Sequence, residues 1–415
     1  MRDLLFLAHR IPFPPNKGDK IRAYHTLRYL RQHFRVHLGC FVDDAADLAY
    51  VEGLAAECAS SCFIRLHPRR ARLASLPALW HGEALSLPYY RHAGLQRWVG
   101  QTLSQYRIAT AMAFSGPMAQ YLPVRTAHGP LARVLDLVDV DSEKWQNYAD
   151  KRQWPLSSLY RREGRCLLEF ERAMARGAEQ VLLVSRAEAA LFRLRAPESA
   201  HKTGHFNNGV DSVYFSPQPS LPDPYGGARA LVFTGAMDYP PNIEAASWMA
   251  ERIMPALRLQ FPALQFHIVG SRPASAVQAL AKRPGIHVSG TVPDVRPYLQ
   301  HAALAVAPLQ IARGVQNKIL EAMAMERTVV ATPQALEGIS AKPGSEVISA
   351  SGEGEFIRNI SSQLLSPDDL GVAARRRVLQ DYQWERNLQR LGAVLGVEMP
   401  SPSPSPVSSP AESAP

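Results

Sequence analysis

Short runs of apolar residues alternate along this chain with longer stretches in which apolar residues recur every three to four positions. The short runs predict buried β-strands, and the longer stretches predict amphipathic helices. Strands that alternate with helices are typical of a parallel sheet covered by helices on its faces. Two such series follow one another, so we predict an α/β protein with two doubly wound parallel-sheet domains.

The first series predicts strands at 3–8, 35–42, 61–66, 109–114, 131–139 and 180–184, and helices at 20–33, 44–58, 91–105, 142–177 and 186–195. The second predicts strands at 229–235, 264–269, 286–289, 303–307, 327–331 and 346–349, and helices at 241–260, 274–282, 294–302, 315–326 and 353–366. Residues 207–228 are rich in Asn, Pro and Gly, which favour turns. We therefore expect domains at 1–206 and 229–366, with 207–228 as the linker.

The chain beyond residue 366 shows two different patterns. Residues 367–396 are helical in pattern, and we expect these helices to pack back on the first domain. Residues 397–415 are rich in Ser and Pro and have no apolar periodicity, which predicts a disordered tail. No repeat of 20 to 50 residues is visible, so a solenoid is disfavoured.

Composition and charge narrow the class of protein. The chain has 415 residues, of which 46% are hydrophobic and 20% charged, and this excludes a mainly disordered protein. Residues 1–210 hold 29 Lys and Arg against 19 Asp and Glu, and the remainder holds 17 against 18. The basic surface of the first domain indicates an anionic partner, either a phosphorylated acceptor, acidic lipid or nucleic acid. A solvated basic face without a partner is the alternative, and nucleic acid is least favoured because no aromatic platform accompanies the cations.

Cysteine usage and hydropathy bear on location. The four cysteines do not match a zinc spacing and are expected to be reduced core residues. The apolar strand 4–8 is too short for the core of a signal peptide, and no run of 18 apolar residues occurs. We expect a cytoplasmic protein, either free or peripheral on the inner membrane.

The segment 313–332 reads as a polar loop, a helix and a buried strand. Gly314 lets the backbone approach a ligand where the chain enters the helix, and the first free N–H groups of a helix favour phosphate. Lys318 lies one turn into this helix, and Glu321 shares its face and can accept hydrogen bonds from sugar hydroxyls. This combination suits a nucleotide-diphosphate sugar. An ordinary helix with a surface ion pair between Lys318 and Glu321 is the alternative.

Ligands of open parallel sheets bind at the carboxyl ends of the strands, which directs attention to the loops there. The loop 9–22 follows the first strand, and its glycine, clustered cations and helix start predict a second anion-facing loop. The residues concerned are Lys17, Gly18, Asp19, Lys20 and Arg22. The alternative is a proline-stiffened connection with Asp19 as a simple N-cap.

Glycines also follow the strands of the second series. Gly235, Gly270 and Gly290 come after three successive strands, and the loop that contains Val292 is well placed to hold a flat base with backbone groups. Each signal is weak alone. Together they predict room for one extended ligand that lies across the sheet edge.

Five segments taken together resemble the retaining GT-B glycosyltransferases of family 4, namely Ala8–His25, Asp136–Trp145, Asn208–Asp211, Gly235–Asn242 and Arg313–Met325. Within that family the chain is most similar to the sugar transferases of PEP-CTERM/exosortase and exopolysaccharide systems, over about residues 2–395. The resemblance implies two Rossmann-like domains that face each other across a cleft. It also implies a nucleotide sugar bound mainly by the second domain, an acceptor bound mainly by the first, and no essential metal.

The chain departs from the family pattern at the donor site. Family members commonly carry two glutamates in an E-x7-E pattern, of which Glu321 matches the second, while Arg313 stands at the first. The usual Arg and Lys diphosphate clamp has no match in 235–242. We therefore expect Arg313 and Lys318 to neutralise the diphosphate. The assignments that follow are catalytic roles for Arg313, Lys318, Gly18 and Asp19, and donor contacts for Gly235, Gly270, Gly290, Val292, Gly314, Val315, Gln316 and Glu321.

On the acceptor side, Ser115 stands where many family members carry a cleft histidine. Asp139 ends a strand and is expected to line the cleft, although an N-cap role for Asp141 or Ser142 is the alternative use of this segment. His9 is a further candidate, together with Lys17, Lys20 and Arg22. The Asp139-Val-Asp141 pair resembles a metal-binding motif, but the resemblance implies no metal here.

The segment 65–80 combines arginines with Leu73, Leu76, Leu79 and Trp80, which suits an anionic membrane surface. Packing of these residues against the core is the alternative. The function expected overall is transfer of a sugar from a nucleotide-diphosphate sugar to a glycan or lipid-linked acceptor in exopolysaccharide or surface glycan synthesis. A UDP-sugar 2-epimerase-like enzyme and a non-catalytic nucleotide- or glycan-binding protein remain open alternatives.

Overall fold

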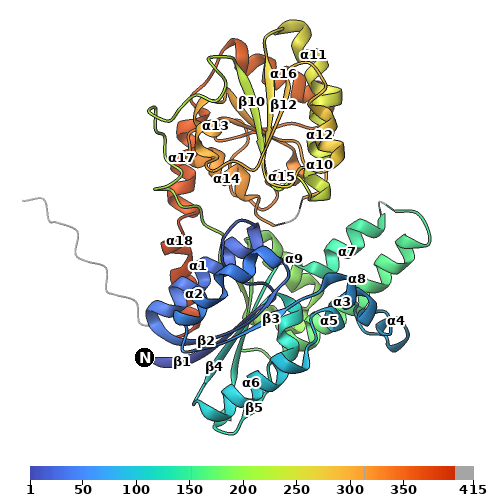
Figure 1. Cartoon of the computed structure of the whole chain (residues 1–415), viewed down its shortest axis with the longest axis vertical. Helices are drawn as coiled ribbons and strands as arrows, with labels where there is room; N and C mark the ends of the chain where they lie inside the picture. Colours follow the sequence, from blue (N-terminus) through green and yellow to red (C-terminus); the bar gives the residue numbers. More distant parts are fainter. Residues whose placement is uncertain (151, 313, 398–415) are drawn as a thin grey trace, which may run out of the picture.

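The computed structural model describes residues 1–150, 152–312 and 314–397. They form two domains, each built on a sheet whose strands are all parallel (Figure 1). The seven-stranded sheet has the order β3-β2-β1-β4-β7-β8-β9, and the six-stranded sheet has the order β12-β11-β10-β13-β14-β15. The predicted α/β class with two doubly wound parallel-sheet domains is confirmed.

The first domain contains the strands β1 (Arg2–Ala8), β2 (Phe34–Val42), β3 (Ser60–Arg65), β4 (Thr110–Phe114), β7 (Ala132–Val138), β8 (Gln180–Leu183) and β9 (Thr203–His205). Its helices are α1 (Gly18–His33), α2 (Val51–Ala56), α3 (Pro68–Ser75), α4 (Ala78–His81), α5 (Ser86–Tyr89), α6 (Ala93–Gln105), α7 (Asp141–Asp150), α8 (Leu156–Arg176) and α9 (Arg186–Arg195). Short 3-10 helices span Ala45–Tyr50, Gly116–Tyr121 and Pro197–Lys202, and a small hairpin pairs β5 (Arg125–Thr126) with β6 (Gly129–Pro130).

The second domain contains the strands β10 (Ala230–Thr234), β11 (Gln265–Val269), β12 (Ile286–Gly290), β13 (Leu304–Ala307), β14 (Val329–Ala331) and β15 (Ile348–Ser349). Its helices are α10 (Pro240–Trp248), α11 (Met254–Gln260), α12 (Ser275–Leu280), α13 (Arg296–His301), α14 (Asn317–Ala324), α15 (Pro333–Leu336) and α16 (Gly352–Leu365). A π-helical turn, Met249–Ile253, connects α10 to α11. Two C-terminal helices follow, α17 (Leu370–Asp381) and α18 (Trp384–Val394).

Several helices differ from their predicted extents. The single helix predicted over 142–177 is two helices, α7 and α8, because Pro155 in the turn between them disfavours helical geometry in the residue before it. The helix predicted over 44–58 divides into a 3-10 helix and the short α2. We did not predict α3, α4, α5, β9 and α15 from the sequence, because elements this short leave little periodic pattern.

The central strands are apolar on both faces because helices cover both sides of each sheet. Residues Leu4 to Ala8 of β1 are fully buried, and so are most residues of β10. A strand that is buried on both faces reads as a continuous apolar run, which is the pattern seen in the sequence. No helix in the described ranges is both long and apolar enough to cross a membrane.

The helix α18 returns to the first domain, as predicted (Figure 1), whereas α17 packs against α14 and joins the core of the second domain. Leu388 and Leu391 of α18 belong to the same apolar cluster as the residues of β1. Trp384 stacks on His25 of α1 with ring centroids 4.3 Å apart and planes 10° from parallel. The amide of Asn387 donates to the Asn208 carbonyl at 3.1 Å, so the two segments that cross between the domains are tied together.

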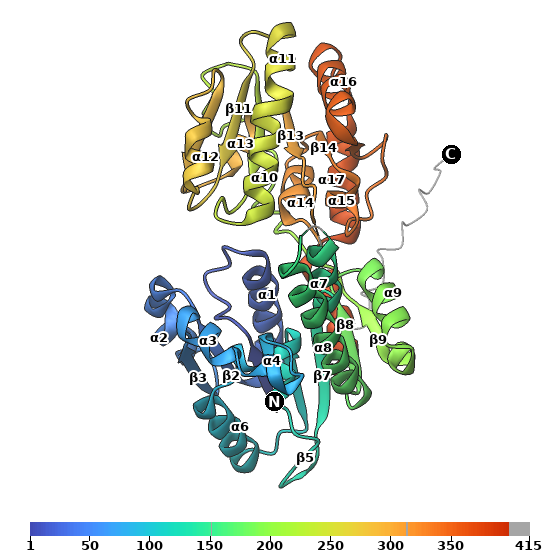
Figure 2. The same ribbon diagram turned by 90° about the vertical axis from the view of Figure 1, so that its right-hand side faces the viewer.

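The two domains lie one above the other, with α1 and α7 of the first facing α14 of the second (Figure 2). In each sheet the strand order reverses beside the first strand, between β1 and β4 and between β10 and β13. The crevice of a doubly wound sheet lies at such a reversal, outside the carboxyl ends of the strands. The loops that follow these strands therefore define the candidate site.

Candidate functional site

The N-termini of α1 and α14 meet between the two domains. A methyl group placed on Gly18 would lie 3.9 Å from the side-chain nitrogen of Asn317, the first residue of α14. The Nδ2 atom of Asn317 is buried and has no hydrogen-bond acceptor among the described residues. Both helix ends carry partial positive charge, and at the start of α1 the carboxylate of Asp19 accepts from the N–H of Lys20 at 3.0 Å. Phosphate binding at the start of α14 stays a prediction.

Lys318 adds a formal positive charge to this place. Its Nζ donates to Oδ1 of Asn242 at 2.5 Å and lies 4.4 Å from the centroid of the Phe233 ring. A Cβ atom on Gly235 would be 3.0 Å from the same Nζ, so the ammonium reaches the loop after β10. Burial lowers the pKa of Lys318 to about 7, although the charge of Glu321 opposes the shift. A bound anion would restore the charged form.

Glu321 lies one turn further along α14 and is half-buried, as Lys318 is. Burial raises the pKa of Glu321 to about 7, and the positive charge of Lys318 opposes that shift. Neither residue is a solvated surface group, so the alternative of an ordinary surface ion pair does not describe this helix. Both lie in the first turn and a half of α14, and their donor roles stay a prediction.

The three predicted glycines end adjacent strands and contact each other through their backbones. The N–H of Gly235 donates to the Val269 carbonyl at 3.0 Å, and that of Gly270 donates to the Gly290 carbonyl at 3.1 Å. A Cβ atom on Gly270 would lie 1.6 Å from the Gly235 oxygen, so only glycine permits this approach. Gly290 has a φ of 70° and open space around it, and Val292 packs half-buried against the core of the second domain.

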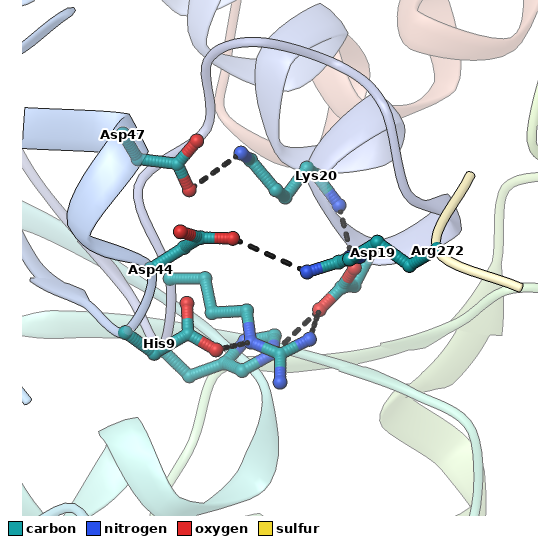
Figure 3. A network of polar contacts seen from close by, with 8 residues as sticks. His9, Asp19, Lys20, Asp44, Asp47 and Arg272 are labelled. Atoms are coloured by element: carbon teal, nitrogen blue, oxygen red, sulfur yellow. Dashed lines mark hydrogen bonds and ion pairs between the residues drawn. The ribbon is translucent and has the colours of Figure 1, made fainter. Parts of the chain in front are cut away.

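The loop after β1 forms a polar network around Asp19 (Figure 3). The carboxylate of Asp19 contacts Nε2 of His9 at 3.1 Å and accepts from Nη1 of Arg10 at 2.8 Å. Burial opposes ionisation of Asp19, but the hydrogen bonds and charges of His9 and Arg10 prevail and hold its pKa well below the usual range. Lys17 occupies the N-cap position of α1 with no side-chain capping bond, so Asp19 is not the N-cap.

Figure 3 also shows a link between the two domains. Arg272 follows β11 in the second domain, and its Nη1 donates to the carboxylate of Asp44 in the first domain at 3.2 Å. The same guanidinium lies 3.2 Å from the carboxylate of Asp238. These residues are partly exposed, so the pair orients the domains with little net stabilisation.

The prediction that Lys20 and Arg22 face the acceptor is wrong. Both side chains are buried, with 2% and 0% of their surface exposed. Lys20 pairs with Asp47 at 2.9 Å, and the guanidinium of Arg22 pairs with both oxygens of Asp136 at 2.9 and 3.0 Å. Charges taken out of water in this way are paired within the protein and are not available to a ligand.

Arg22 instead takes part in a chain of hydrogen bonds that reaches the start of α14. Its Nη1 donates to Oδ1 of Asn208 at 3.1 Å, and Nδ2 of Asn208 donates to Oδ1 of Asn317 at 3.3 Å. A continuous chain of hydrogen bonds therefore runs from Asp136, in β7 of the first sheet, to the start of α14. It sets the orientation of the Asn317 amide, whose nitrogen remains free for a ligand.

Two neighbouring strands of the first sheet end in strained backbone at the cleft. Ser115 after β4 has a φ of 77°, and Val138 at the end of β7 has a φ of 69°. Left-handed geometry is unfavourable for both residue types, and a β-branched residue such as valine tolerates it least. Such strain is concentrated at functional sites. It places Asp139 directly after Val138, at the edge that faces the second domain.

Asp139 reaches across to the second domain at Gly314. A Cβ atom on Gly314 would lie 2.4 Å from Oδ1 of Asp139, and this oxygen is buried with no hydrogen-bond partner among the described residues. Burial, together with the charges of Glu188 and Asp141, raises the pKa of Asp139 to about 7. The space beside Gly314 is taken by the Asp139 carboxyl, so the approach of this glycine to a ligand stays a prediction.

Some site residues were missing from the sequence-based prediction, and others lie outside the described residues. Asn208, Asn242 and Asn317 were not singled out, because an asparagine carries no charge signal and its use depends on contacts distant in sequence. Val315 and Gln316 are half-buried just before α14, where Gln316 takes the N-cap position. Arg313 and the tail 398–415 lie outside the described residues.

Comparison with known proteins agrees with this architecture. Residues 228–364 match the family model described as "Glycosyl transferases group 1". The chain is similar to Alr3699/HepE of Anabaena, crystallised with UDP, with a TM-score of 0.68 and 16% identity over 95% of this chain and 100% of that chain. Sucrose-phosphate synthase (tll1590) from Thermosynechococcus elongatus is similar with a TM-score of 0.70 and 17% identity, covering 95% and 98%.

A glycosyltransferase from Rickettsia africae ESF-5 is similar with a TM-score of 0.59 and 11% identity, covering 95% of this chain and 99% of that chain. No curated protein matches the sequence. At these identities the solved structures show the fold, which is the two-domain arrangement expected for the GT-B class. The family match lies within the second domain, which also carries α14.

Proposed function

We propose that this protein is a glycosyltransferase that moves a sugar from a nucleotide-diphosphate sugar to a glycan or lipid-linked acceptor. The observation that carries this proposal is the meeting of two helix N-termini between the domains, beside Lys318 and the Asn317 Nδ2, which has no acceptor among the described residues. Two positive helix ends, one cation and one free donor suit a diphosphate better than a neutral ligand.

The donor occupies the second domain in this proposal. The match of residues 228–364 to the glycosyl transferase group 1 model supports this, and structures of the Anabaena protein are described with UDP and with UDP-glucose. UDP-sugars are therefore the first donors to test. We assign the base to the loop after β12, the diphosphate to the start of α14 and the hydroxyl groups to Glu321.

Transfer proceeds by stabilisation of the leaving diphosphate. The bond between the anomeric carbon and the phosphate oxygen breaks, the acceptor oxygen forms a bond to that carbon on the same face, and the acceptor proton passes to the departing phosphate. Retention follows from this geometry. Lys318, Arg313 and the N–H groups of α14 supply the positive charge without a metal, and preorganised charge of this kind is the largest contribution in many enzymes.

Asp19 and Asp139 have different roles because their surroundings differ. Asp19 is held ionised by His9 and Arg10, so it fixes the loop that carries Gly18. Asp139 has a pKa raised to about 7, so near neutral pH part of the population is protonated and can donate a hydrogen bond to a sugar oxygen.

The acceptor side is the basic first domain, which holds 29 Lys and Arg against 19 Asp and Glu within residues 1–210. This charge suits a phosphorylated or lipid-diphosphate acceptor at the cytoplasmic face of a membrane. Together with the sequence resemblance, it leads us to propose a role in exopolysaccharide or surface glycan synthesis, with peripheral association with the inner membrane.

A thermal-shift panel of UDP-, GDP- and ADP-sugars, followed by turnover with lipid-diphosphate acceptors, tests this function. We expect one nucleotide class to raise the melting temperature and its sugar to be transferred with the anomeric configuration kept. Isomerised sugar formed from donor alone would identify an epimerase instead. Donor binding without turnover on any acceptor would identify a non-catalytic binding protein.

A further inference from the structure

The segment that contains α3 and α4 buries two of its small residues and exposes three of its large apolar ones, while Leu79 is half-buried. Ser75 and Ala78 face inward, with 4% and 2% of their surface exposed. Leu73, Leu76 and Trp80 face outward, with 66%, 46% and 81% exposed. This is the reverse of the usual distribution, in which large apolar side chains are the ones removed from water.

The outward orientation is held by two adjacent charged residues of α8, the half-buried Arg162 and the buried Glu163. Nη2 of Arg162 donates to the carbonyls of Ala78 at 2.5 Å and of Glu83 at 3.1 Å, at the start of α4 and just beyond its end. The carboxylate of Glu163 accepts from the N–H groups of Leu85 at 2.7 Å and Ser86 at 3.1 Å, where α5 begins. Adjacent residues of α8 thus hold this segment on both sides of residue 84, so the exposed leucines and tryptophan are fixed on the outer side.

A second apolar protrusion lies on the same side of the domain. Trp154 and Leu156, in the turn between α7 and α8, have 81% and 47% of their surface exposed. Leu156 precedes Arg162 by six residues of helix, which is about 9 Å along the axis. Because Arg162 bonds directly to α4, the two protrusions are neighbours. Figure 2 looks onto the side of the domain that carries α3, α4, α7 and α8.

Arginines surround these apolar residues. Arg69, Arg70 and Arg72 are exposed on α3, and in the described part of the chain none of them lies within ion-pair distance of a carboxylate. Arg152 and Arg161 are exposed beside the second protrusion. Arg161 lies 3.9 Å from the carboxylate of Asp150. Tryptophan and leucine projecting among exposed arginines suit the boundary between acidic headgroups and acyl chains.

We infer that this surface docks on an anionic lipid bilayer. We name it the α3–α4 patch and define it as Arg69, Arg70, Arg72, Leu73, Leu76, Trp80, Trp154 and Leu156. The patch protrudes and is basic, so charge complementarity favours a bilayer carrying acidic headgroups over a protein partner, which would need a matching hollow of acidic character.

The purpose of this docking rests on the proposed function. α7 runs from the cleft edge at Asp139 to the turn that carries Trp154, and its ten residues span about 15 Å. A bilayer in contact with the patch would therefore lie about one short helix from the site of transfer. That separation suits an acceptor whose sugar or diphosphate remains attached to a lipid.

Vesicle flotation tests the inference directly. We expect the full chain to float with phosphatidylglycerol-containing vesicles at low salt and not with pure phosphatidylcholine vesicles. The variants Leu73→Ser/Trp80→Ser and Arg69→Glu/Arg70→Glu should each lower vesicle affinity at least about tenfold. Leu259→Ser and Arg358→Glu are matched controls, because Leu259 is 86% exposed and Arg358 is exposed on the second domain. These should bind as the wild type does.

Fluorescence gives a second measurement. Trp80 and Trp154 are exposed, whereas Trp98, Trp145, Trp248 and Trp384 are buried or half-buried. Brominated lipids should quench the first two, so quenching should decrease by about half in Trp80→Ser or Trp154→Ser. Quenching that stays unchanged in both variants, or patch variants that float as well as the controls, would overturn the inference. A wild type that does not float would also overturn it and would favour a protein partner.

Neither measurement uses donor or acceptor, so the inference and the proposed function can fail separately. Vesicle binding through the patch in a protein that transfers no sugar would leave the inference standing and remove the function. Transfer to a water-soluble acceptor by a protein that ignores vesicles would do the reverse. Thermal melts of the variants confirm folding, which exposed substitutions should leave within about 1 kcal/mol, or a few degrees.

Discussion

Replacing Lys318 with methionine should weaken donor binding by about 10- to 150-fold. A hydrogen bond between a charged group and its partner contributes about 1.5 to 3 kcal/mol, which converts to this range. Methionine keeps an unbranched apolar stem beside the Phe233 ring, 4.4 Å from the present Nζ, and removes only the charge and the bond to Asn242. Lys282→Met is the matched control, because Lys282 is exposed on the same domain.

The same substitution should leave the free protein as stable as the wild type or more stable. Lys318 is a desolvated cation whose pKa is lowered to about 7 by burial. Between pH 7 and about 10.4, the unfolded chain binds a proton at this residue that the folded protein lacks. Wild-type stability should therefore rise relative to the Met variant as pH increases through this window. Urea titrations at pH 7 and pH 9.5 measure the difference.

Calorimetry of UDP binding at pH 8 provides the deciding assay. A diphosphate beside Lys318 should raise its pKa again, so the wild type should take up close to one proton on binding, seen as a dependence of the binding enthalpy on the ionisation enthalpy of the buffer. The Met variant should take up none. Unchanged affinity together with unchanged proton uptake would refute this reading of the site.

Three further substitutions test the supports of the site. Gly270→Ala should destabilise the protein by about 3 kcal/mol, measured by urea denaturation, because its Cβ would lie 1.6 Å from the Gly235 oxygen. Arg22→Leu should cost about 3 to 5 kcal/mol in the same assay, because Asp136 would remain buried without its cation. Burial raises the pKa of Glu171 to about 8, so the folded state holds an extra proton between pH 4.5 and 8 and loses stability as pH rises. Glu171→Gln should therefore melt higher than the wild type at pH 8 and show little gain at pH 5.

Each of these predictions has its own control. In Gly290→Ala the new Cβ would have no atom within 4 Å, so only the strain of a positive φ should remain. The loss of unfolding free energy should therefore be smaller than for Gly270→Ala. The double variant Arg22→Leu/Asp136→Leu should recover part of the loss of Arg22→Leu, and equal losses would argue against an uncompensated charge. A Glu171→Gln difference that does not change between pH 5 and pH 8 would mean that Glu171 is ionised in the folded protein.

The fold was predictable because its signals are local. A strand such as β1 reads as an unbroken apolar run, and α9 has the bounds predicted for it, Arg186–Arg195, because Ser185 caps its start with a bond to the N–H of Glu188. The alternation of strands and helices then predicts that the strands of each sheet are parallel, whereas their order in the sheet was not predicted. The break between α7 and α8 was missed, although Pro155 marks it, because the apolar period continues on both sides.

The candidate site was predictable only in part. Lys318, Glu321 and Gly314 lie at the start of a helix that follows a strand, and that position alone directs them to the sheet edge. Lys20 and Arg22 belong to an equally basic loop, but α1 turns them away from the cleft. Arg22 meets Asp136, which lies 114 residues away in the sequence.

The asparagines of the site could not be predicted either, because their contacts are distant in the sequence. Asn208 lies in the segment that joins the domains and Asn317 lies 109 residues later at the start of α14, yet one amide orients the other. Nothing in the local pattern distinguishes them from asparagines in turns. Their role follows only from the contact between the joining segment and α14, which no local pattern in the sequence specifies.

The most direct test of the account is a crystal structure with an intact sugar nucleotide, compared with one without ligand. We expect the diphosphate at the start of α14, within hydrogen-bond distance of the Lys318 ammonium and the Asn317 amide, with Gly18 at its other side. A nucleotide bound elsewhere, with the meeting point of α1 and α14 occupied only by water, would contradict the central claim.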